Sequence, residues 1–248
     1  MVRIALIGCG WIVRTVYLPA LAQRSDVDIA AVYDPDPQSL QAVFMHYPNF
    51  TWYKSLDSVW WTRADAVIVA SPNFTHTAYS KASLLAGRHV LCEKPIALSA
   101  TEAVETIQLA KNVGKIYFPA FAYRFRQDVK YFHGEVLKIG RIHSIRTEWV
   151  RRSGIPRPGT WITDRNRSGG GVLVDLGSHM LDICMRYIED TDIQTVWMKT
   201  EHCDDYLANR AGWNGSPGAR TGIMDVETRA EGQVLFQSGQ KLSFDFNW

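Results

Sequence analysis

Residues 89–97 read His89-Val90-Leu91-Cys92-Glu93-Lys94-Pro95-Ile96-Ala97. The apolar run is typical of a buried strand, and an acid, a base and a proline follow directly at its carboxyl end. A buried Glu and Lys are costly unless they pair or meet a ligand. Because ligands of open parallel sheets bind beyond the carboxyl ends of the strands, Glu93 and Lys94 are candidates for a binding site. A surface loop with two solvated charges is the alternative.

The composition is that of an ordinary globular protein. Of the 248 residues, 46% are hydrophobic and 21% are charged, and the formal net charge is +2. This charge gives no indication of nucleic acid or an anionic membrane surface as a partner. The four cysteines lack a CxxC spacing, which is typical of reduced thiols in a cytoplasmic protein. No run is long enough to span a membrane, the start does not read as a signal peptide, and no metal site is expected.

The N-terminal residues have the pattern that opens a dinucleotide-binding unit. A strand predicted over residues 2–7 ends in Gly8-Cys9-Gly10, and a helix is predicted over residues 12–24. The glycines permit a tight turn and let backbone amides approach a pyrophosphate at the helix N-terminus. Val13 stands where a third glycine or an alanine normally allows close packing of the helix on the strand.

A carboxylate after the second predicted strand bears on the choice of cofactor. Asp34 follows the strand expected over residues 28–33, about where a carboxylate accepts hydrogen bonds from the adenosine ribose. The same charge would repel a 2′-phosphate, so NAD is favoured and NADP is the alternative. A turn or helix cap is the structural alternative for Asp34, since Asp-Pro pairs are common turn formers.

Strands and helices alternate through the first half of the chain, which predicts a doubly wound parallel sheet. A strand over residues 66–70 ends at Ser71-Pro72-Asn73, whose polar groups are candidates either for cofactor contacts or for capping the next helix. The other elements predicted for this half are helices over residues 38–45, 75–86 and 101–113, a strand over residues 115–120 and a short element over residues 54–59.

The second half predicts a helix with an unusual polar stripe, over residues 172–188 behind Gly169-Gly170-Gly171. The stripe recurs at the spacing of one helical face and consists of Asp175, His179, Asp182 and Arg186. A bystander histidine on an amphipathic surface helix is the alternative to a functional one. The other elements predicted are a helix over residues 128–139, strands over residues 141–151 and 193–200, a loop over residues 203–222, and a hairpin of residues 229–236 and 241–248.

Seven arginines and no lysine lie between residues 141 and 167, with only Glu148 and Asp164 as acids. A basic stretch is usually a solvated face, but Arg also binds phosphate and carboxylate groups in bidentate geometry. The sharper hypothesis is therefore a docking surface for an anionic group, as in a nucleotide-linked sugar or a sugar acid.

Three motifs closely resemble those of the Gfo/Idh/MocA oxidoreductases: Ile7-Gly8-Cys9-Gly10, the run from Ala66 to His76, and Gly87-Arg88-His89-Val90-Leu91-Cys92-Glu93-Lys94-Pro95. The likeness covers the whole chain. It implies a Rossmann NAD(P)-binding domain at residues 1–120 and an α+β domain at residues 121–248, with an open, mostly antiparallel sheet that is shorter than in relatives. It also implies that subunits pair through this sheet, and the alternating Leu242, Phe244, Phe246 and Trp248 suit such burial.

The resemblance assigns roles to individual residues. Lys94 is expected to reach the reacting oxygen and stabilise its developing charge, and Glu93 to lie beside the nicotinamide. Asp175 and His179 match the family's pattern Gly-Gly-x-x-x-Asp-x-x-x-His, so His179 is expected to act as general acid or base, with Asp175 orienting it. We therefore expect the active site between the two domains. Ala122 replaces an asparagine that is frequent in relatives.

The expected cofactor contacts are Gly8, Gly10, Trp11, Ile12, Asp34, Ser71, Pro72, Asn73, His76, Glu93 and Lys94. The expected substrate contacts are Lys94, Tyr123, Arg124, Trp161, Asp175 and His179.

The sequence thus predicts an NAD(P)-dependent oxidoreductase that transfers a hydride between nicotinamide and a sugar, cyclitol or related hydroxyl or ketone. A homodimer or homotetramer in the cytoplasm is expected. Two alternatives stay open, namely a reductase of another unsaturated small molecule and a non-catalytic NAD(P)-binding sensor. Val13, Ala122 and the short C-terminal end keep the sensor open.

Overall fold

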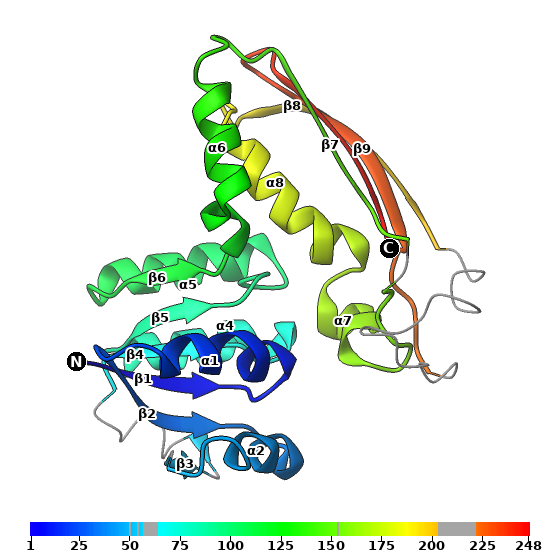
Figure 1. Ribbon diagram of the computed structural model, residues 1–248. Helices are drawn as coiled ribbons and strands as arrows, with labels where there is room; N and C mark the ends of the chain where they lie inside the picture. The colour runs from blue at the N-terminus through cyan, green and yellow to red at the C-terminus, as the bar shows by residue number, and fades with distance from the viewer. Residues whose placement is uncertain (50, 54, 57–63, 153, 203–221) are drawn as a thin grey trace. The chain divides into compact units, whose positions relative to one another are not determined.

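The computed structural model describes residues 1–49, 51–53, 55–56, 64–152, 154–202 and 222–248, and the chain forms two compact units (Figure 1). Unit 1 is Met1–Ala120 and unit 2 is Phe121–Trp248. Most of the short element predicted at 54–59, and the loop predicted at 203–222 apart from its last residue, lie outside the described residues.

Unit 1 is built on a six-stranded parallel sheet in the order β3-β2-β1-β4-β5-β6. Its strands are β1 (Val2–Ile7), β2 (Val27–Tyr33), β3 (Trp52–Tyr53), β4 (Ala66–Val69), β5 (His89–Cys92) and β6 (Tyr117–Pro119). This is the strand order of a doubly wound dinucleotide-binding sheet, so the predicted fold class is confirmed. The order reverses between β1 and β4, which are neighbours in the sheet.

Helices cover both faces of this sheet, which explains why its strands carry apolar residues at successive positions, as at residues 4–7 of β1. Leu6 packs in one buried cluster with residues of the first two helices, and the next residue, Ile7, packs in another with the helices on the opposite face. Successive side chains of a strand point to opposite faces, so both must be apolar. The helices are α1 (Leu18–Ala22) and α2 (Pro37–Phe44) on the first face and α4 (Asn73–Leu85) and α5 (Ala100–Asn112) on the second.

The helix predicted over residues 12–24 is not a regular α-helix along its whole length. It contains a π-helical segment, η1 (Val13–Tyr17), which continues into α1. Val13, which stands where a smaller residue is usual, is fully buried in the cluster beneath this helix. The sheet therefore accommodates the larger side chain within its core.

Unit 2 is a four-stranded sheet in the order β7-β10-β9-β8. Its strands are β7 (Ser144–Val150), β8 (Ile193–Glu201), β9 (Arg229–Phe236) and β10 (Lys241–Asn247). The β9–β10 hairpin is antiparallel as predicted, β8 pairs antiparallel with β9, and β10 pairs parallel with β7. The helical segments are η2 (Ala122–Phe125), α6 (Gln127–Val136), η3 (Trp161–Thr163), α7 (Arg165–Ser168), η4 (Leu173–Gly177) and α8 (Ser178–Met185).

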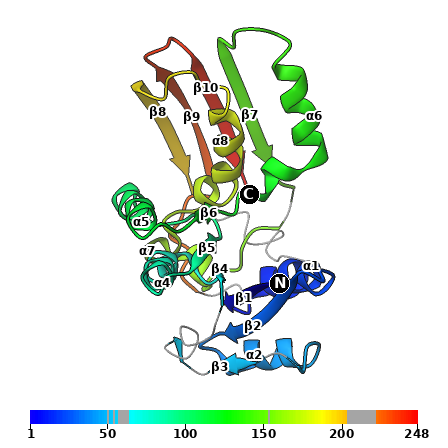
Figure 2. The same ribbon diagram turned by 90° about the vertical axis from the view of Figure 1, so that its left-hand side faces the viewer.

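The expectation that the aromatic face of the hairpin pairs subunits is wrong. Leu242, Phe244, Phe246 and Trp248 are buried inside unit 2, where they pack on η4 and α8. Figures 1 and 2 show α8 lying along the concave side of the sheet that these side chains face. Alternation predicted correctly that one face is buried, but the helix of the same unit covers it.

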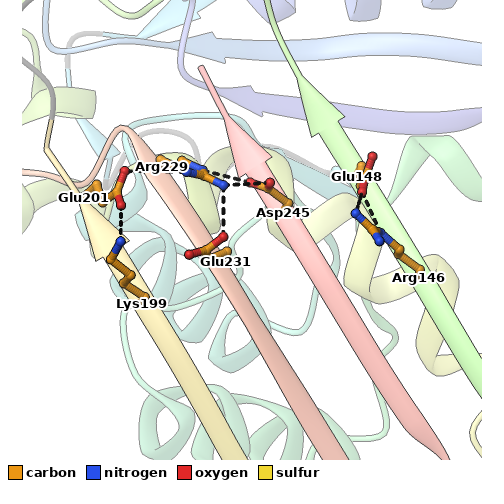
Figure 3. A network of polar contacts seen from close by, with 7 residues as sticks. All are labelled: Arg146, Glu148, Lys199, Glu201, Arg229, Glu231 and Asp245. Carbon is orange, nitrogen blue, oxygen red and sulfur yellow. Dashed lines mark hydrogen bonds and ion pairs between the residues drawn. The ribbon is translucent and has the colours of Figure 1, made fainter.

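The opposite face of this sheet carries a charged network (Figure 3), and the exposed side chains of Trp197 and Val150 lie on the same face. Arg229 on β9 bonds to Glu231 at 2.9 Å and to both carboxylate oxygens of Asp245 at 3.0 and 3.1 Å. Pairs of Arg146 with Glu148 and of Lys199 with Glu201 extend the network across β7 and β8. In the described part of the chain, no helix has both the length and the apolarity to cross a membrane.

Candidate functional site

The loops after β2, β1, β4 and β5 emerge side by side at one edge of the unit 1 sheet. Backbone hydrogen bonds join Gly8 to the end of β2 at 2.8 Å, Ala70 to the end of β1 at 2.8 Å, and Glu93 to the end of β4 at 2.9 Å. The predicted cofactor residues of these four loops therefore share one edge, where open parallel sheets bind ligands.

The two glycines after β1 differ in what constrains them. Gly8 has a φ of +101°, and a Cβ there would lie 2.5 Å from the carbonyl oxygen of Ala70, so only glycine fits. A Cβ at Gly10 would meet no atom within 4 Å, so space is open beside its backbone. This combination of a forced turn and an open backbone suits the close approach of a pyrophosphate.

Asp34 ties the glycine turn to the end of β2. Its carboxylate accepts from the Cys9 amide at 2.6 Å and from the Asp36 amide at 2.8 Å. A carboxylate offers about four lone-pair positions, so capacity remains for ribose hydroxyls. Burial, with the Asp34 charge beside it, raises the pKa of the Cys9 thiol to about 12.

The loop after β4 is shaped by its own side chains. The Ser71 and Thr75 hydroxyls lie 2.6 Å apart, and the Thr75 hydroxyl also donates to the Pro72 carbonyl at 2.7 Å. Asn73 is buried and begins α4, two residues earlier than predicted. These hydroxyl contacts hold the loop, but no side-chain hydrogen bond caps α4 at Pro72, so the capping and the cofactor interpretations of Ser71 both stay predictions.

The structure gives His76 a different position from the expected cofactor contact. Its ring is 1% exposed, and both nitrogens face backbone carbonyls, Nδ1 that of Pro95 and Nε2 that of Ser71, each at 2.7 Å. A side chain held in this way is enclosed by the two loops. We therefore correct its assignment from a cofactor contact to a residue that joins the loops.

Glu93 is held by a tyrosine that the sequence did not single out. The Tyr17 hydroxyl of η1 donates to Glu93 Oε1 at 2.7 Å, and Glu93 Oε2 lies 3.3 Å from the Lys94 amide. Burial and the Glu93 carboxylate raise the pKa of Tyr17 above its ordinary value, so this hydroxyl stays protonated as a donor. Glu93 and Lys94 are both partly exposed at the edge of the sheet. Of the remaining cofactor candidates, Trp11 is exposed and Ile12 is half-buried.

In unit 2, His179 on α8 lies among aromatic rings. Its ring centroid is 4.5 Å from that of Tyr123, 6.4 Å from that of Trp149 and 6.5 Å from that of Phe121. Tyr123 was predicted as a substrate contact, whereas Trp149 was missed. The alternation of β7, which points Trp149 to the same face as the buried Thr147, is the signal that identifies it.

Asp175 lies one turn before His179 and makes contacts of its own. It accepts from the Trp248 indole at 3.1 Å and lies 3.9 Å from the Arg151 guanidinium. Arg151 also packs over the Trp149 ring, with 5.5 Å to its centroid. Arg151, Trp149 and Asp175 thus form one connected cluster with His179, and the roles of Arg151 and Trp248 were not predicted.

A distant glutamate holds the glycine turn that precedes these residues. Glu227 Oε1 accepts from the Gly171 amide at 2.8 Å and from the Leu173 amide at 3.3 Å. A Cβ at Gly171 would lie 2.0 Å from the Glu227 carbonyl oxygen, so this close approach requires glycine at position 171. The turn leads into η4, a π-helical segment, so Asp175 and His179 do not follow regular α-helical spacing.

The remaining polar residues of the predicted stripe have different surroundings. Asp182 has a side chain only 7% exposed and pairs with Arg124 through two hydrogen bonds, one of them at 2.6 Å. Arg124 is therefore already held by a carboxylate of its own unit. Arg186 is exposed beyond the end of α8, and the predicted substrate residue Trp161 is half-buried in η3.

Four of the seven arginines between residues 141 and 167 face acids. Their partners are Glu189 for Arg141, Glu148 for Arg146, Asp175 for Arg151 and Glu227 for Arg165. Three of those acids lie outside the segment, which is why the sequence count made it look uncompensated. Arg152 and Arg157 are exposed.

Two further observations concern ligands. Among the residues that the structure describes, no group of three or more His, Cys, Asp or Glu side chains could hold a metal ion.

A cavity of about 440 Å³ lies between α1 and α2 of unit 1, outside the predicted site residues. Its lining is Arg14, Leu18, Ala42, Val43, His46 and Tyr47.

Comparison with known proteins identifies the family of both units. Residues 2–121 match the family described as "Oxidoreductase family, NAD-binding Rossmann fold", and residues 137–248 match the "GFO/IDH/MocA C-terminal domain". The "Putative UDP-kanosamine synthase oxidoreductase subunit" of Amycolatopsis mediterranei is 32% identical over 100% of this chain and 68% of its own length. The "D-glucoside 3-dehydrogenase" of Escherichia coli is 33% identical over 74% of this chain and 53% of its own.

A solved structure shares the fold. The crystal structure of GenD2 from gentamicin A biosynthesis, in complex with NAD, superposes with a TM-score of 0.81 at 22% identity, over 100% of this chain and 66% of that one. The chain thus spans about half to two thirds of the lengths of these proteins. Both of its units match, and the chain therefore belongs to the Gfo/Idh/MocA family of NAD-binding oxidoreductases.

Proposed function

We propose that this chain belongs to an NAD-dependent oxidoreductase that oxidises the hydroxyl at position 3 of a glucose-type sugar, or reduces the matching ketone. The observation that carries the proposal is His179, a proton-transfer group enclosed by the rings of Tyr123 and Trp149. A sugar ring has an apolar C–H face and a rim of hydroxyls. In such a site the aromatic rings can pack on the C–H face of the sugar, and the imidazole can exchange a proton with one of its hydroxyls.

The proposed chemistry divides the work between a few side chains. NAD, when bound, supplies the carbon that takes or gives the hydride. His179 removes the hydroxyl proton during oxidation and returns it during reduction. Lys94 donates to the same oxygen and stabilises its developing negative charge. Asp175, which lies beside Arg151 and Trp248, supports the protonated form of His179.

Unit 1 supplies the proposed cofactor site. Gly8 and Gly10 let the pyrophosphate approach the backbone, and the Asp34 carboxylate accepts from the adenosine ribose. Because Asp34 would also repel a 2′-phosphate, we propose NAD as the preferred cofactor. A binding titration with NAD and NADP tests this choice, and equal affinity for the two would contradict it.

The name of the Escherichia coli relative supports position 3 of a glucoside as the reacting centre, and the name of the Amycolatopsis relative supports a nucleotide-linked sugar. The exposed Arg152 and Arg157 are the arginines that we propose for an anionic group on the substrate. If methyl glucoside is turned over as well as UDP-glucose and glucose 6-phosphate, the anionic preference is wrong.

The experiment that tests the function is a spectrophotometric assay of NAD reduction with UDP-glucose, glucose 6-phosphate, methyl glucoside and myo-inositol. NADH formation with a glucose derivative, and a 3-keto product identified by NMR, is the expected result. Binding of NAD without reduction by any of the four substrates would refute the proposal.

We also propose that the protein is a cytoplasmic homo-oligomer that pairs through the unit 2 sheet. The outer face around Arg229, which also exposes Trp197, is the surface that we propose for pairing in place of the buried aromatic face. Cys9, Cys92 and Cys184 are free thiols, as expected of a reducing compartment. Sedimentation of the wild type and of an Arg229→Glu variant tests the interface, and an unchanged oligomer would argue against it.

A further inference from the structure

His76 connects two loops of the candidate site, and its contacts in them, Ser71 and Pro95, are 24 residues apart in the sequence. The first loop, at Ser71, follows β4 and belongs to the proposed cofactor site. The second, at Pro95, follows β5 and directly succeeds Lys94. The two 2.7 Å contacts of the buried ring therefore join the loop of the proposed cofactor site to the loop that contains Lys94.

The geometry demands two donors from one ring. Both partners are carbonyl oxygens, which only accept hydrogen bonds. A neutral imidazole carries one N–H, so its second nitrogen would direct a lone pair at a carbonyl oxygen. Only the imidazolium satisfies both contacts, because both of its nitrogens donate.

The surroundings of the ring act in opposite directions on its charge. Burial is the largest influence and lowers the pKa of His76 below its ordinary value, and Lys94 acts in the same direction. The two carbonyls and the Glu93 carboxylate favour the charged form. The ring therefore carries its second N–H only at pH values on the acidic side of the range in which histidine ordinarily titrates.

We propose that His76 is a positioning residue that braces the cofactor loop against the loop of Lys94 by donating from both ring nitrogens. The brace is complete in the imidazolium and is reduced to one contact when the ring is neutral. The functional part of this inference rests on the proposed role of Lys94, whereas the brace itself does not.

Two substitutions separate the contacts. In His76→Asn the amide nitrogen reaches the position of Nδ1 and keeps a donor for the Pro95 carbonyl. In His76→Gln it reaches the position of Nε2 and keeps a donor for the Ser71 carbonyl. Since losing a single hydrogen bond changes an equilibrium by about tenfold, we expect NAD affinity to fall about tenfold in His76→Asn with kcat nearly unchanged. In His76→Gln, kcat is expected to fall about tenfold with NAD affinity nearly unchanged.

His89→Asn is the matched control. His89 lies on β5 in the same unit, and Nδ1 of its ring accepts from the Ile116 amide at 3.0 Å. An asparagine oxygen can accept in place of Nδ1, so neither the NAD affinity nor kcat is expected to change in His89→Asn. Equal losses of affinity and turnover in both His76 variants would indicate a merely structural histidine and would overturn the proposal.

Two readouts do not require turnover. Hydrogen exchange is expected to quicken at residues 93–97 in His76→Gln and at residues 71–75 in His76→Asn. In the wild type labelled with ¹⁵N-histidine, the second ring nitrogen of His76 is expected to gain its proton in an acid titration that extends below the ordinary histidine range. A ring that stays singly protonated throughout, or exchange that does not separate the two loops, would overturn the brace even in a protein that turns over no sugar.

Discussion

Replacing Glu227 should loosen the helix that carries Asp175 and His179, while most of the molecule stays folded. The Glu227 side chain is 9% exposed, and one of its oxygens accepts from the amides of Gly171 and Leu173. Hydrogen bonds to a charged group contribute about 1.5–3 kcal/mol each, and water that enters the truncated site recovers part of the loss. We therefore expect Glu227→Ala to lower the local free energy of opening by about 3 kcal/mol.

Hydrogen exchange measured by mass spectrometry on residues 170–186 is the appropriate assay, because a chain of two compact units need not unfold in one step. A loss of 3 kcal/mol corresponds to exchange that is roughly 100-fold faster. Glu227→Gln keeps an acceptor oxygen and should cost about 1 kcal/mol. The control is Glu189→Ala, which removes an exposed partner of Arg141 and should cost less than about 1 kcal/mol. If Glu227→Ala and Glu189→Ala quicken exchange equally, the reasoning about the glycine turn is wrong.

Three further predictions concern other parts of the fold. Gly8→Ala should strain the turn by at least about 1–3 kcal/mol and abolish NAD binding in a fluorescence titration, whereas Gly10→Ala should fold normally. Burial raises the pKa values of the Cys9 and Cys92 thiols from 9.0 to about 12, so the folded state keeps protons that the unfolded state releases. The free energy of unfolding should therefore decline as the pH rises above 9. Denaturation midpoints measured from pH 8 to 11 would show this decline, and midpoints that do not change with pH would contradict the prediction. Phe246→Ala, at a fully buried position, should cost about 3–5 kcal/mol in urea unfolding followed by tryptophan fluorescence, and a loss below about 1 kcal/mol would argue against its place in the core.

The sheet of unit 1 could be predicted well because its signals are local. The parallel strands are mostly apolar, and a polar or glycine residue follows the strand end, as Gly8, Asp34, Ser71 and Glu93 do. Neighbouring parallel strands bring such ends to one edge, so the grouping of these residues followed from topology.

The details of the candidate site depend on partners far away in the sequence. The close approach of Glu227 requires Gly171, and the indole of Trp248 donates a hydrogen bond to Asp175. Nothing in the local sequence around residues 169–179 indicates either partner. The π-helical turn at η4 also changes the spacing that a regular helix would give.

The errors have the same origin. Alternation showed that one face of the β9–β10 hairpin is buried, but it could not show that α8 covers it. His76 was placed near the cofactor from its position after β4, but which atoms its ring faces depends on Pro95 in the next loop. The sequence of residues 141–167 did not show the acids that pair with three of its arginines, because Glu189, Asp175 and Glu227 come from later elements.

The most direct test of the proposed function follows a labelled hydride. A glucoside or UDP-glucose carrying deuterium at position 3 is incubated with NAD and the wild-type protein, Lys94→Ala or His179→Ala. We predict deuterated NADH from the wild type, and rates about 10²- to 10⁴-fold lower in both variants, with NAD affinity nearly unchanged. Wild-type rates in both variants, or NADH that carries no deuterium, would contradict the account.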